Sequence, residues 1–419
     1  MSEATVPALP PAPPAPQRLM SLDALRGFDM FWIIGADSLV AALHRMALNG
    51  ADNSTGLSVT GFLAYELEHA EWEGFHFYDL IFPLFVFMAG VSMVFSLGKI
   101  IRQEGRAAAV RRVLRRGILL FLAGLFYSGG FSNPWPDMRL MGVLNRIALC
   151  YLLAGLIFCF CNLRAMIALS VTLLAAYWAL LTFVPIRNIQ LEKRALQELA
   201  RQRGAPFDPK ALFYGTTEHV TGHYGHGLNL SDHLDFQYLP GRKYDTYFDP
   251  EGILSTMPAV VTCLLGVFAG LLLLDPGRND PQKVICLLAG GLALAALGWA
   301  WSAQFPVIKK IWTSSYVLVA GGYSALLLGL FYWIVDMAGY RRWCQPFVWM
   351  GMNSITVYLT ANMLGGFRAL GRRLAGGDIR DYLNNHAWGS GDLVLAAVGL
   401  ALAFWFVHFL YRRKIFLRL

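Results

Sequence analysis

The fold is decided by a stretch that reads Glu68-His69-Ala70-Glu71-Trp72-Glu73-Gly74-Phe75-His76-Phe77-Tyr78-Asp79 and continues into the apolar segment Leu80–Leu97. An apolar run of about 18 residues is long enough to cross the hydrocarbon core of a bilayer as a helix. The stretch therefore predicts a membrane-spanning helix with an ionisable cluster at its entrance. One carboxylate, Asp79, is carried past that entrance.

The rest of the chain repeats the apolar pattern. Of its 419 residues, 56% are hydrophobic and only 15% are charged, whereas a soluble domain carries about 25% charged residues. We therefore predict an all-α fold, a polytopic transmembrane bundle of about ten helices. The expected spans are Leu22–Leu43, Phe77–Leu97, Gly117–Phe131, Met141–Phe160, Ala165–Val184, Leu254–Leu274, Val284–Trp301, Trp312–Val335, Phe347–Leu364 and Asp392–Leu410.

Basic residues in the short loops predict the orientation. They gather in the loop Lys99–Arg116, at Arg341-Arg342 and in the tail after Leu410, all on one side of the expected bundle. Excess Lys and Arg mark the cytoplasmic side. We therefore expect a multi-pass protein of the inner membrane with both termini in the cytoplasm. The transmembrane domain would cover 18–419, with a long extracytoplasmic loop at about 185–252.

The remaining composition excludes several classes of protein. Residues 1–17 are rich in Pro and Ala and read as a disordered cytoplasmic tail rather than a cleaved signal peptide. The six cysteines lie in or beside apolar segments, so neither a disulfide framework nor a zinc site is expected. The net charge of +8 is explained by membrane topology, and no nucleic-acid partner is expected.

Acidic residues at membrane depth are the first candidates for a functional site, because burying them is costly. Asp29 and Asp37 stand eight residues apart in the first expected helix, which predicts a shared helix face. Asp37 reaches the outer end and is a candidate site residue. Asp29 could instead pair with a basic side chain on a neighbouring helix.

His69 is the candidate proton acceptor, because a histidine beside carboxylates can exchange protons near neutral pH. The alternative is an ordinary interfacial histidine that is hydrogen-bonded to Glu68 or Glu71. Asp79 is either its partner or a carboxylate that bonds across helices.

Three further segments carry polar groups with open roles. The run Glu218–His233 has histidines of metal-ligand type, but glycines interrupt it and we expect no metal. Lys309 and Lys310 lie outside, against the charge rule, which suggests either an anionic acceptor or a structural ion pair. Asp249 and Glu251 precede a helix, so favourable placement at its N-terminus could explain them alone.

Seven motifs in order carry a family resemblance. They are Asp23-Ala24-Leu25-Arg26-Gly27, His69-Ala70-x-Trp72-x-Gly74, Asp79-Leu80-Ile81-Phe82-Pro83-Leu84-Phe85-Val86-Phe87, Gly142-Val143-Leu144-Asn145-Arg146-Ile147, Asp249-Pro250-Glu251-Gly252, Trp312-Thr313-Ser314-Ser315-Tyr316 and Gly351-Met352-Asn353-Ser354-Ile355. From about Arg18 onward the chain resembles the heparan-α-glucosaminide N-acetyltransferase family, in particular its bacterial members.

The resemblance implies transfer of an acetyl group from cytosolic acetyl-CoA to the amine of a terminal glucosamine across the membrane. It places His69 on the family's catalytic histidine, as general base or acetyl carrier, and Asp37 where the animal enzyme has an asparagine. Asp79 is the other expected aid to His69. Expected contacts to acetyl-CoA are Arg26, Arg116, Asn145, Arg146, Asn353 and Ser354. Expected contacts to the sugar or glycan acceptor are Glu68, Asp249, Glu251 and Trp312.

A transporter is the alternative function. Five helices on each side of the long loop, with Asp29, Asp37 and Asp79 among them, would also suit proton-coupled uptake of an amino sugar. The basic segment Arg111–Arg116 is expected to meet membrane lipids, and the alternative is a phosphorylated cofactor that approaches from the cytosol. A homodimer has no specific sequence signal and stays open.

Overall fold

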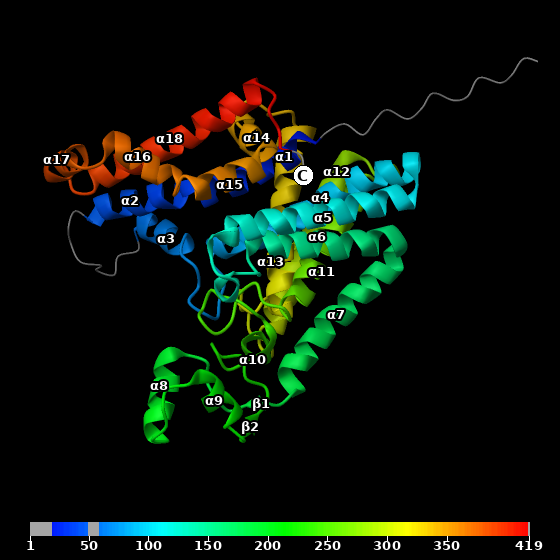
Figure 1. Ribbon diagram of the computed structural model, residues 1–419. Helices are drawn as coiled ribbons and strands as arrows, with labels where there is room; N and C mark the ends of the chain where they lie inside the picture. Colours follow the sequence, from blue (N-terminus) through cyan, green and yellow to red (C-terminus); the bar gives the residue numbers. More distant parts are fainter. Residues whose placement is uncertain (1–18, 49–57, 418–419) are drawn as a thin grey trace, which may run out of the picture.

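The computed structural model describes residues 19–48 and 58–417, and this part of the chain is almost entirely helical (Figure 1). The predicted tail 1–17 lies outside the described residues. Eight helical runs in the described part are long and apolar enough to cross a membrane, which confirms the prediction of an all-α membrane bundle. They are Met20–Leu48, α4 (Phe77–Glu104), α6 (Val143–Phe160), α7 (Leu163–Phe183), α11 (Thr256–Leu273), α12 (Asp280–Trp301), α13 with its last turn (Ser314–Met337) and α18 (Ser390–Arg412).

One predicted span is more charged than expected. The helix expected at Gly117–Phe131 is α5 (Arg106–Tyr127), and α4 continues to Glu104. The basic residues expected in a loop therefore lie on two helices, and the turn between them is at Gly105, where φ is +86°. The prediction of a basic loop over Lys99–Arg116 was wrong, because arginine and lysine are good helix formers.

Two predicted helices are interrupted. The span expected as one helix over Phe347–Leu364 is two, α14 (Gln345–Met352) and α15 (Ser354–Met363), which meet at Asn353. The first span consists of α1 (Met20–Phe31), a π-helical turn over Trp32–Ala36 and α2 (Asp37–Leu48). That turn, with Gly35 at φ +140°, breaks the regular α-helical register from which Asp29 and Asp37 were predicted to share a face.

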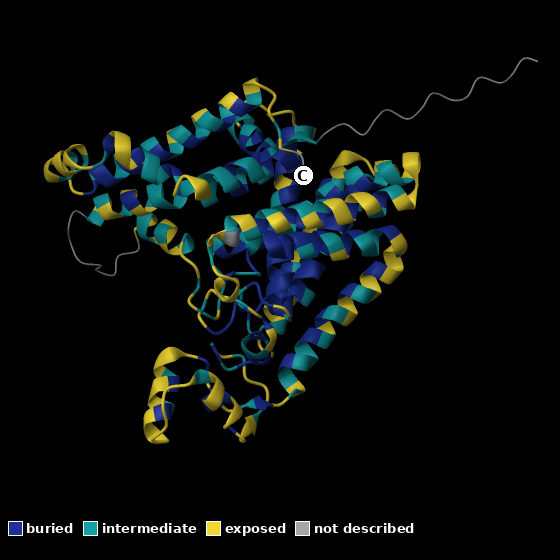
Figure 2. Ribbon diagram, in the orientation of Figure 1, coloured by how far each residue is buried: buried dark blue, intermediate teal, exposed yellow. Residues whose placement is uncertain are grey.

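The bundle is held by close helix pairs. The most extensive pairings join α12 with α13, α4 with α11, α1 with α14 and α5 with α6. In Figure 2 the buried residues gather along α11 and α13. The outer helices turn apolar side chains outward, such as Ile118 on α5 and Val171 on α7. Exposed apolar side chains suit a surface that faces lipid.

The segment between α7 and α11 forms a small cap at the bottom of Figure 1. The antiparallel strands β1 (Ile186–Arg187) and β2 (His219–Val220) pair at its base. In the chain, α8 (Lys193–Gln202) and α9 (Pro209–Tyr214) lie between the two strands, and α10 (Leu230–Tyr238) follows β2. The cap has an apolar cluster of its own around Leu196 and Phe213.

The other elements are short. They are α3 (Val59–Glu66), α16 (Phe367–Ala375), α17 (Asp378–His386) and the 3-10 turns Gly130–Ser132 and Trp135–Asp137. In Figure 1, α16 and α17 lie beside α18 at the far end from the cap.

Candidate active site

A cavity of about 430 Å³ opens where α4 begins. Its apolar wall comes from α1, the first two turns of α4, the start of α6 and α15. Most of its polar side chains come from the loops that join the helices, namely His69, Arg139, Tyr244, Glu251, Lys309 and Lys310. Three more lie on helices, Tyr78 on α4 and Ser354 and Tyr358 on α15.

The loop before α4 holds His69 against the helix. His69 Nδ1 lies 2.8 Å from Asp79 Oδ1, and the other Asp79 oxygen accepts the backbone N–H groups of Ala70 and His76 at 3.1 Å. The Asp79 carboxylate is 1% exposed, whereas the His69 ring is 54% exposed. Asp79 therefore orients the imidazole through Nδ1 and leaves the Nε2 edge of the ring accessible.

The turn before α13 brings a lysine to the same place. Gly74 N–H donates to the Val307 carbonyl at 2.9 Å, and Glu73 forms a β-bridge with Ile308. This pairing sets Lys309 beside the histidine: its Nζ lies 2.9 Å from His69 Nδ1 and 3.2 Å from Asp79 Oδ1. Burial lowers the pKa of Lys309, although the attraction of Asp79 opposes that shift.

These three groups admit two proton arrangements, because Nδ1 cannot donate and accept at once. In the first, Nδ1–H donates to Asp79 and Nε2 presents a lone pair to the cavity. In the second, Lys309 donates to Nδ1 and Nε2 carries the proton. Only the first arrangement lets His69 accept a proton from a molecule in the cavity.

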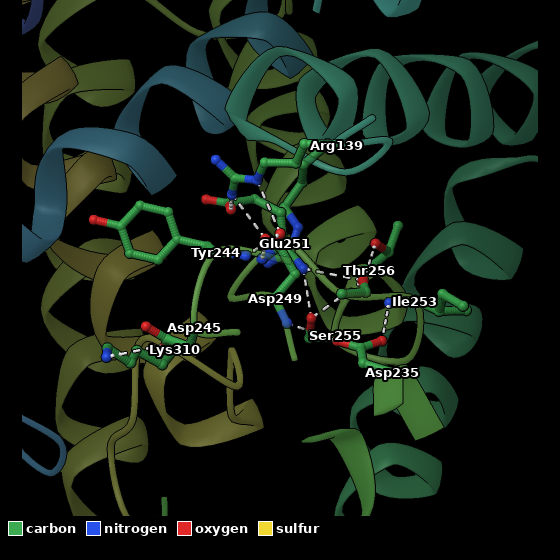
Figure 3. A network of polar contacts seen from close by, with 12 residues as sticks. Arg139, Asp235, Tyr244, Asp245, Asp249, Glu251, Ile253, Ser255, Thr256 and Lys310 are labelled. Atoms are coloured by element: carbon green, nitrogen blue, oxygen red, sulfur yellow. Dashed lines mark hydrogen bonds and ion pairs between the residues drawn. The ribbon is translucent and has the colours of Figure 1, made fainter. Parts of the chain in front are cut away.

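A second polar cluster also contributes to the lining of the cavity (Figure 3). Arg139 binds Asp249 with two bonds, Nε to Oδ2 at 2.9 Å and Nη2 to Oδ1 at 2.8 Å. The same Nη2 donates to Glu251 Oε2 at 2.8 Å, and the guanidinium lies over the Tyr244 ring at 5.0 Å. Burial, and then the neighbouring Asp249, raise the pKa of Glu251 to about 7. A carboxylate that titrates near neutral pH in a cavity is a candidate for proton or cation binding.

The candidate acids outside these clusters lie apart from the cavity. Asp37 is half-buried at the start of α2, where the charge of Arg368 acts on it. Asp29 is fully buried, and neither carboxylate oxygen has a hydrogen-bond partner in the described residues. Glu68 uses its backbone carbonyl to accept from His76 at 2.9 Å. None of these three side chains lines the cavity.

The expected acetyl-CoA contacts are spread over the bundle, and only Ser354 lines the cavity. Arg26 bonds Ser92 at 2.6 Å, where α1 meets α4. Arg116 lies over the Tyr151 ring at 4.8 Å. Asn145 donates to the Phe121 carbonyl at 3.0 Å, and Asn353 donates to the Trp349 carbonyl at 3.2 Å.

Arg146 and Trp312 pack against each other beside the cavity. Arg146 is fully buried, donates to the Gly252 carbonyl at 3.2 Å and to Ser255 Oγ, and lies 5.0 Å from the Trp312 ring. Trp312 lines the cavity and donates to Thr262 Oγ1 at 3.1 Å. Arg146 thereby ties the loop that carries Glu251 to α6.

The histidine-rich segment of the cap has structural roles. His233 contacts the Ile189 carbonyl at 3.1 Å, and Asp232 Oδ2 accepts the Gly227 N–H at 2.9 Å. In the described residues, no group of three His, Cys, Asp or Glu side chains is arranged to hold a metal ion.

Sequence reasoning missed Arg139, Tyr244 and Tyr358 as cavity residues. It noted Lys309 as an exception to the charge rule, which was the available signal, but did not place it beside His69. The sequence suggested two explanations for Lys309 and Lys310, an anionic acceptor or a structural ion pair. The structure shows an ion pair for Lys310, whose Nζ lies 3.2 Å from Asp245 Oδ2.

Comparisons with known proteins agree with the resemblance in the sequence. A family model described as heparan-alpha-glucosaminide N-acetyltransferase, catalytic, matches residues 18–191. The protein named heparan-alpha-glucosaminide N-acetyltransferase of Mus musculus is 26% identical over an alignment of 385 positions, which covers 83% of this chain and 56% of the relative. The protein of that name from Homo sapiens is 24% identical over an alignment of 437 positions, which covers 96% of this chain and 60% of the relative. The chain thus spans little more than half the length of these relatives.

Proposed function

We propose that this chain, which is similar to the heparan-α-glucosaminide N-acetyltransferase family, is a transmembrane acetyltransferase. It moves the acetyl group of acetyl-CoA to the amine of a glucosamine-type sugar. The observation that carries the proposal is the His69–Asp79 pair, an oriented imidazole on the wall of a cavity that is large enough for small reactants. Its family relatives bear the name of an N-acetyltransferase.

His69 acts as the general base. An amine attacks a thioester only in its neutral form, so a proton must leave the nitrogen as the carbon–nitrogen bond forms. With Nδ1–H bonded to Asp79, Nε2 accepts that proton. The carbon–sulfur bond then breaks, and the proton is returned to the CoA thiolate.

An acetyl-histidine route uses the same geometry. Nε2 would attack the thioester first and expel the CoA thiolate, and the amine would then take the acetyl group from the imidazole and release its proton to that thiolate. In both routes Asp79 stabilises the positive charge that develops on the ring, so the two routes share one requirement.

Glu251 binds the acceptor amine. It lines the cavity with one oxygen bonded to Arg139, and its ionised form would attract an ammonium group. That ammonium must lose one proton before the neutral amine attacks, and a carboxylate with a pKa of about 7 can accept it. Asp249 holds Arg139 in place, and the Trp312 and Tyr244 rings offer flat surfaces against which a sugar can pack. Glu68 remains a more remote candidate for the same acceptor.

Acetyl-CoA enters from the cytoplasm in this proposal, and the acceptor is on the extracytoplasmic side. The basic ends of α4 and α5 mark the cytoplasmic side by the positive-inside rule, and His69 lies at the opposite end of α4. The candidates to contact CoA on its path between the helices remain Arg26, Arg116, Asn145, Arg146 and Asn353. Asp37 remains a candidate to assist His69 from the outer end of the first span.

The test uses purified protein in detergent with acetyl-CoA and glucosamine. Release of CoA thiol and formation of N-acetylated sugar are both followed for the wild type and for His69→Ala. His219→Ala, in the exposed strand β2, is the matched control. We expect sugar-dependent release of CoA that is lost in His69→Ala and retained in the control.

Two outcomes would count against the proposal. Equal rates in His69→Ala and the wild type would remove the histidine from the reaction. Absence of acetyl-CoA binding, together with flux of labelled sugar into proteoliposomes, would establish a transporter instead.

A further inference from the structure

Lys309 is an unusual neighbour for a catalytic base. Its ammonium lies 2.9 Å from His69 Nδ1, 3.4 Å from His69 Nε2 and 3.2 Å from Asp79 Oδ1. Its side chain is 22% exposed and lines the same cavity. A lysine that served only to neutralise Asp79 would need no access to the cavity.

The position of Nζ limits where a reacting carbonyl can lie. An amine that gives its proton to Nε2 sits about 3 Å from that nitrogen, and Nζ is 3.4 Å from the same atom. The carbonyl carbon under attack lies next to the amine, and its oxygen is one bond further. Nζ is therefore within hydrogen-bond reach of the oxygen for a carbonyl that approaches from the lysine side.

We propose that Lys309 donates a hydrogen bond to the thioester oxygen and stabilises the oxyanion that forms during acetyl transfer. This inference rests on the proposed acetyltransferase function. As the amine nitrogen bonds to the carbonyl carbon, the carbonyl π pair moves to oxygen, where Lys309 stabilises it. The pair returns when the carbon–sulfur bond breaks, and the lysine keeps its protons throughout.

The same movement prepares the base. When Lys309 turns toward the substrate oxygen, it gives up its hydrogen bond to Nδ1. That nitrogen can then hold the imidazole proton and donate a hydrogen bond to Asp79. The Nε2 lone pair is thereby presented to the amine. Binding of the thioester therefore selects the proton arrangement in which His69 can act.

The experiment compares Lys309→Met, Lys309→Gln and Lys309→Arg with the wild type in the purified full-length protein. kcat and the KM of each substrate are measured, with the affinity for a thioether analogue of acetyl-CoA that has no carbonyl next to sulfur. Lys210→Met, on the exposed face of α9 in the cap, is the matched control.

We expect Lys309→Met to lower kcat by about 10²- to 10³-fold, the range found for loss of one oxyanion donor. Its affinity for the thioether analogue should change by less than about threefold, because that ligand offers no oxyanion. Lys309→Arg and Lys309→Gln, which keep a donor, should recover about tenfold or more of the lost rate. In a His69→Ala background, Lys309→Met should cost much less than it does alone, because the two groups act together.

Three results would overturn the inference. These are an unchanged kcat in Lys309→Met, a loss matched by weaker binding of the thioether analogue, or equal losses in all three variants, which would indicate a packing role. If the wild type itself transfers no acetyl group, the proposed function fails. An active wild type with an indifferent Lys309 rejects only the inference.

Discussion

At the scale of single residues, the proposed reaction depends on how Asp79 is held. Its two oxygens accept from the Ala70 and His76 backbone and contact His69, so the carboxylate cannot turn away without breaking three contacts. An asparagine at this position would keep the shape but could not stabilise an imidazolium.

Asp79→Asn is therefore expected to lower kcat by about 10²- to 10⁴-fold, the range of a general-base contribution, with acetyl-CoA binding retained. Steady-state rates and equilibrium binding check this. Asp29→Asn is the control, because an amide at that buried position removes an unpaired carboxylate and should cost little. A larger loss in Asp29→Asn than in Asp79→Asn would favour proton-coupled transport.

Glu251 predicts how acceptor binding depends on pH. Burial and Asp249 raise its pKa to about 7, so below that pH the group is protonated and cannot pair with an ammonium. The KM for glucosamine should therefore rise as pH falls below 7, by up to about tenfold per unit, while the KM for acetyl-CoA stays constant. Glu251→Gln should have the high KM at every pH, and a parallel pH dependence in that variant would contradict the assignment.

The contacts that the sequence could predict differ from those that it could not in the separation of the two residues along the chain. His69 and Asp79 lie ten residues apart in one stretch, and the sequence predicted their pairing as one of two alternatives for Asp79. Lys309 meets His69 across 240 residues and Arg139 meets Asp249 across 110. Contacts of that range are set by helix packing, which no local pattern specifies.

At the scale of elements, the bundle depends on helices that approach without side chains between them. A Cβ built on Gly27 would lie 1.7 Å from the Phe347 carbonyl oxygen, and one on Gly351 would lie 1.9 Å from the Asp23 carbonyl oxygen. The two glycines thus face each other's helices where α1 crosses α14. Small residues at such crossings allow close backbone packing within a membrane.

Gly27→Ala and Gly351→Ala are each expected to destabilise the protein by about 1–3 kcal/mol or more, because the clash is with backbone. Thermal unfolding in detergent should show a lower midpoint for each variant. Gly290→Ala is the matched control on α12, where nothing lies within 4 Å of the added Cβ. It should unfold at the wild-type temperature or slightly above it, and an equal fall in all three would refute the packing argument.

The interrupted helices show a limit of sequence reasoning at this scale. Apolar length predicted the spans at α1–α2 and α14–α15, yet Gly35 and Asn353 break them into pieces. Glycine and asparagine are tolerated inside helices often enough that composition does not mark a break. Both interrupted runs contribute side chains to the cavity wall, Met30 and Ile33 from one and Ser354 and Tyr358 from the other.

At the scale of the whole molecule, the placement of the cap and of the basic helix ends predicts sidedness. The cap between α7 and α11 and the basic ends of α4 and α5 lie at opposite ends of α4 and α7 in Figure 1. The positive-inside rule then predicts the cap outside and the basic ends inside.

Cysteine labelling with a membrane-impermeant maleimide checks this orientation. Glu198→Cys on α8 should be labelled in intact cells, and Arg111→Cys on α5 only after permeabilisation. The unmodified chain reports the background from its own thiols, of which Cys150, Cys159, Cys263 and Cys344 are buried. The reverse pattern would place acetyl-CoA and acceptor on the opposite sides from those proposed.

The exposure of His69 carries a further consequence. In the proposed reaction, a ring that is 54% exposed is also open to water, so hydrolysis of the thioester would compete with transfer. The ratio of acetylated sugar to free acetate would then depend on how long the acceptor stays beside Glu251, and therefore on acceptor supply. Such an enzyme without acceptor would slowly hydrolyse the cell's acetyl-CoA, which would make acceptor scarcity a metabolic burden as well as a pause in synthesis.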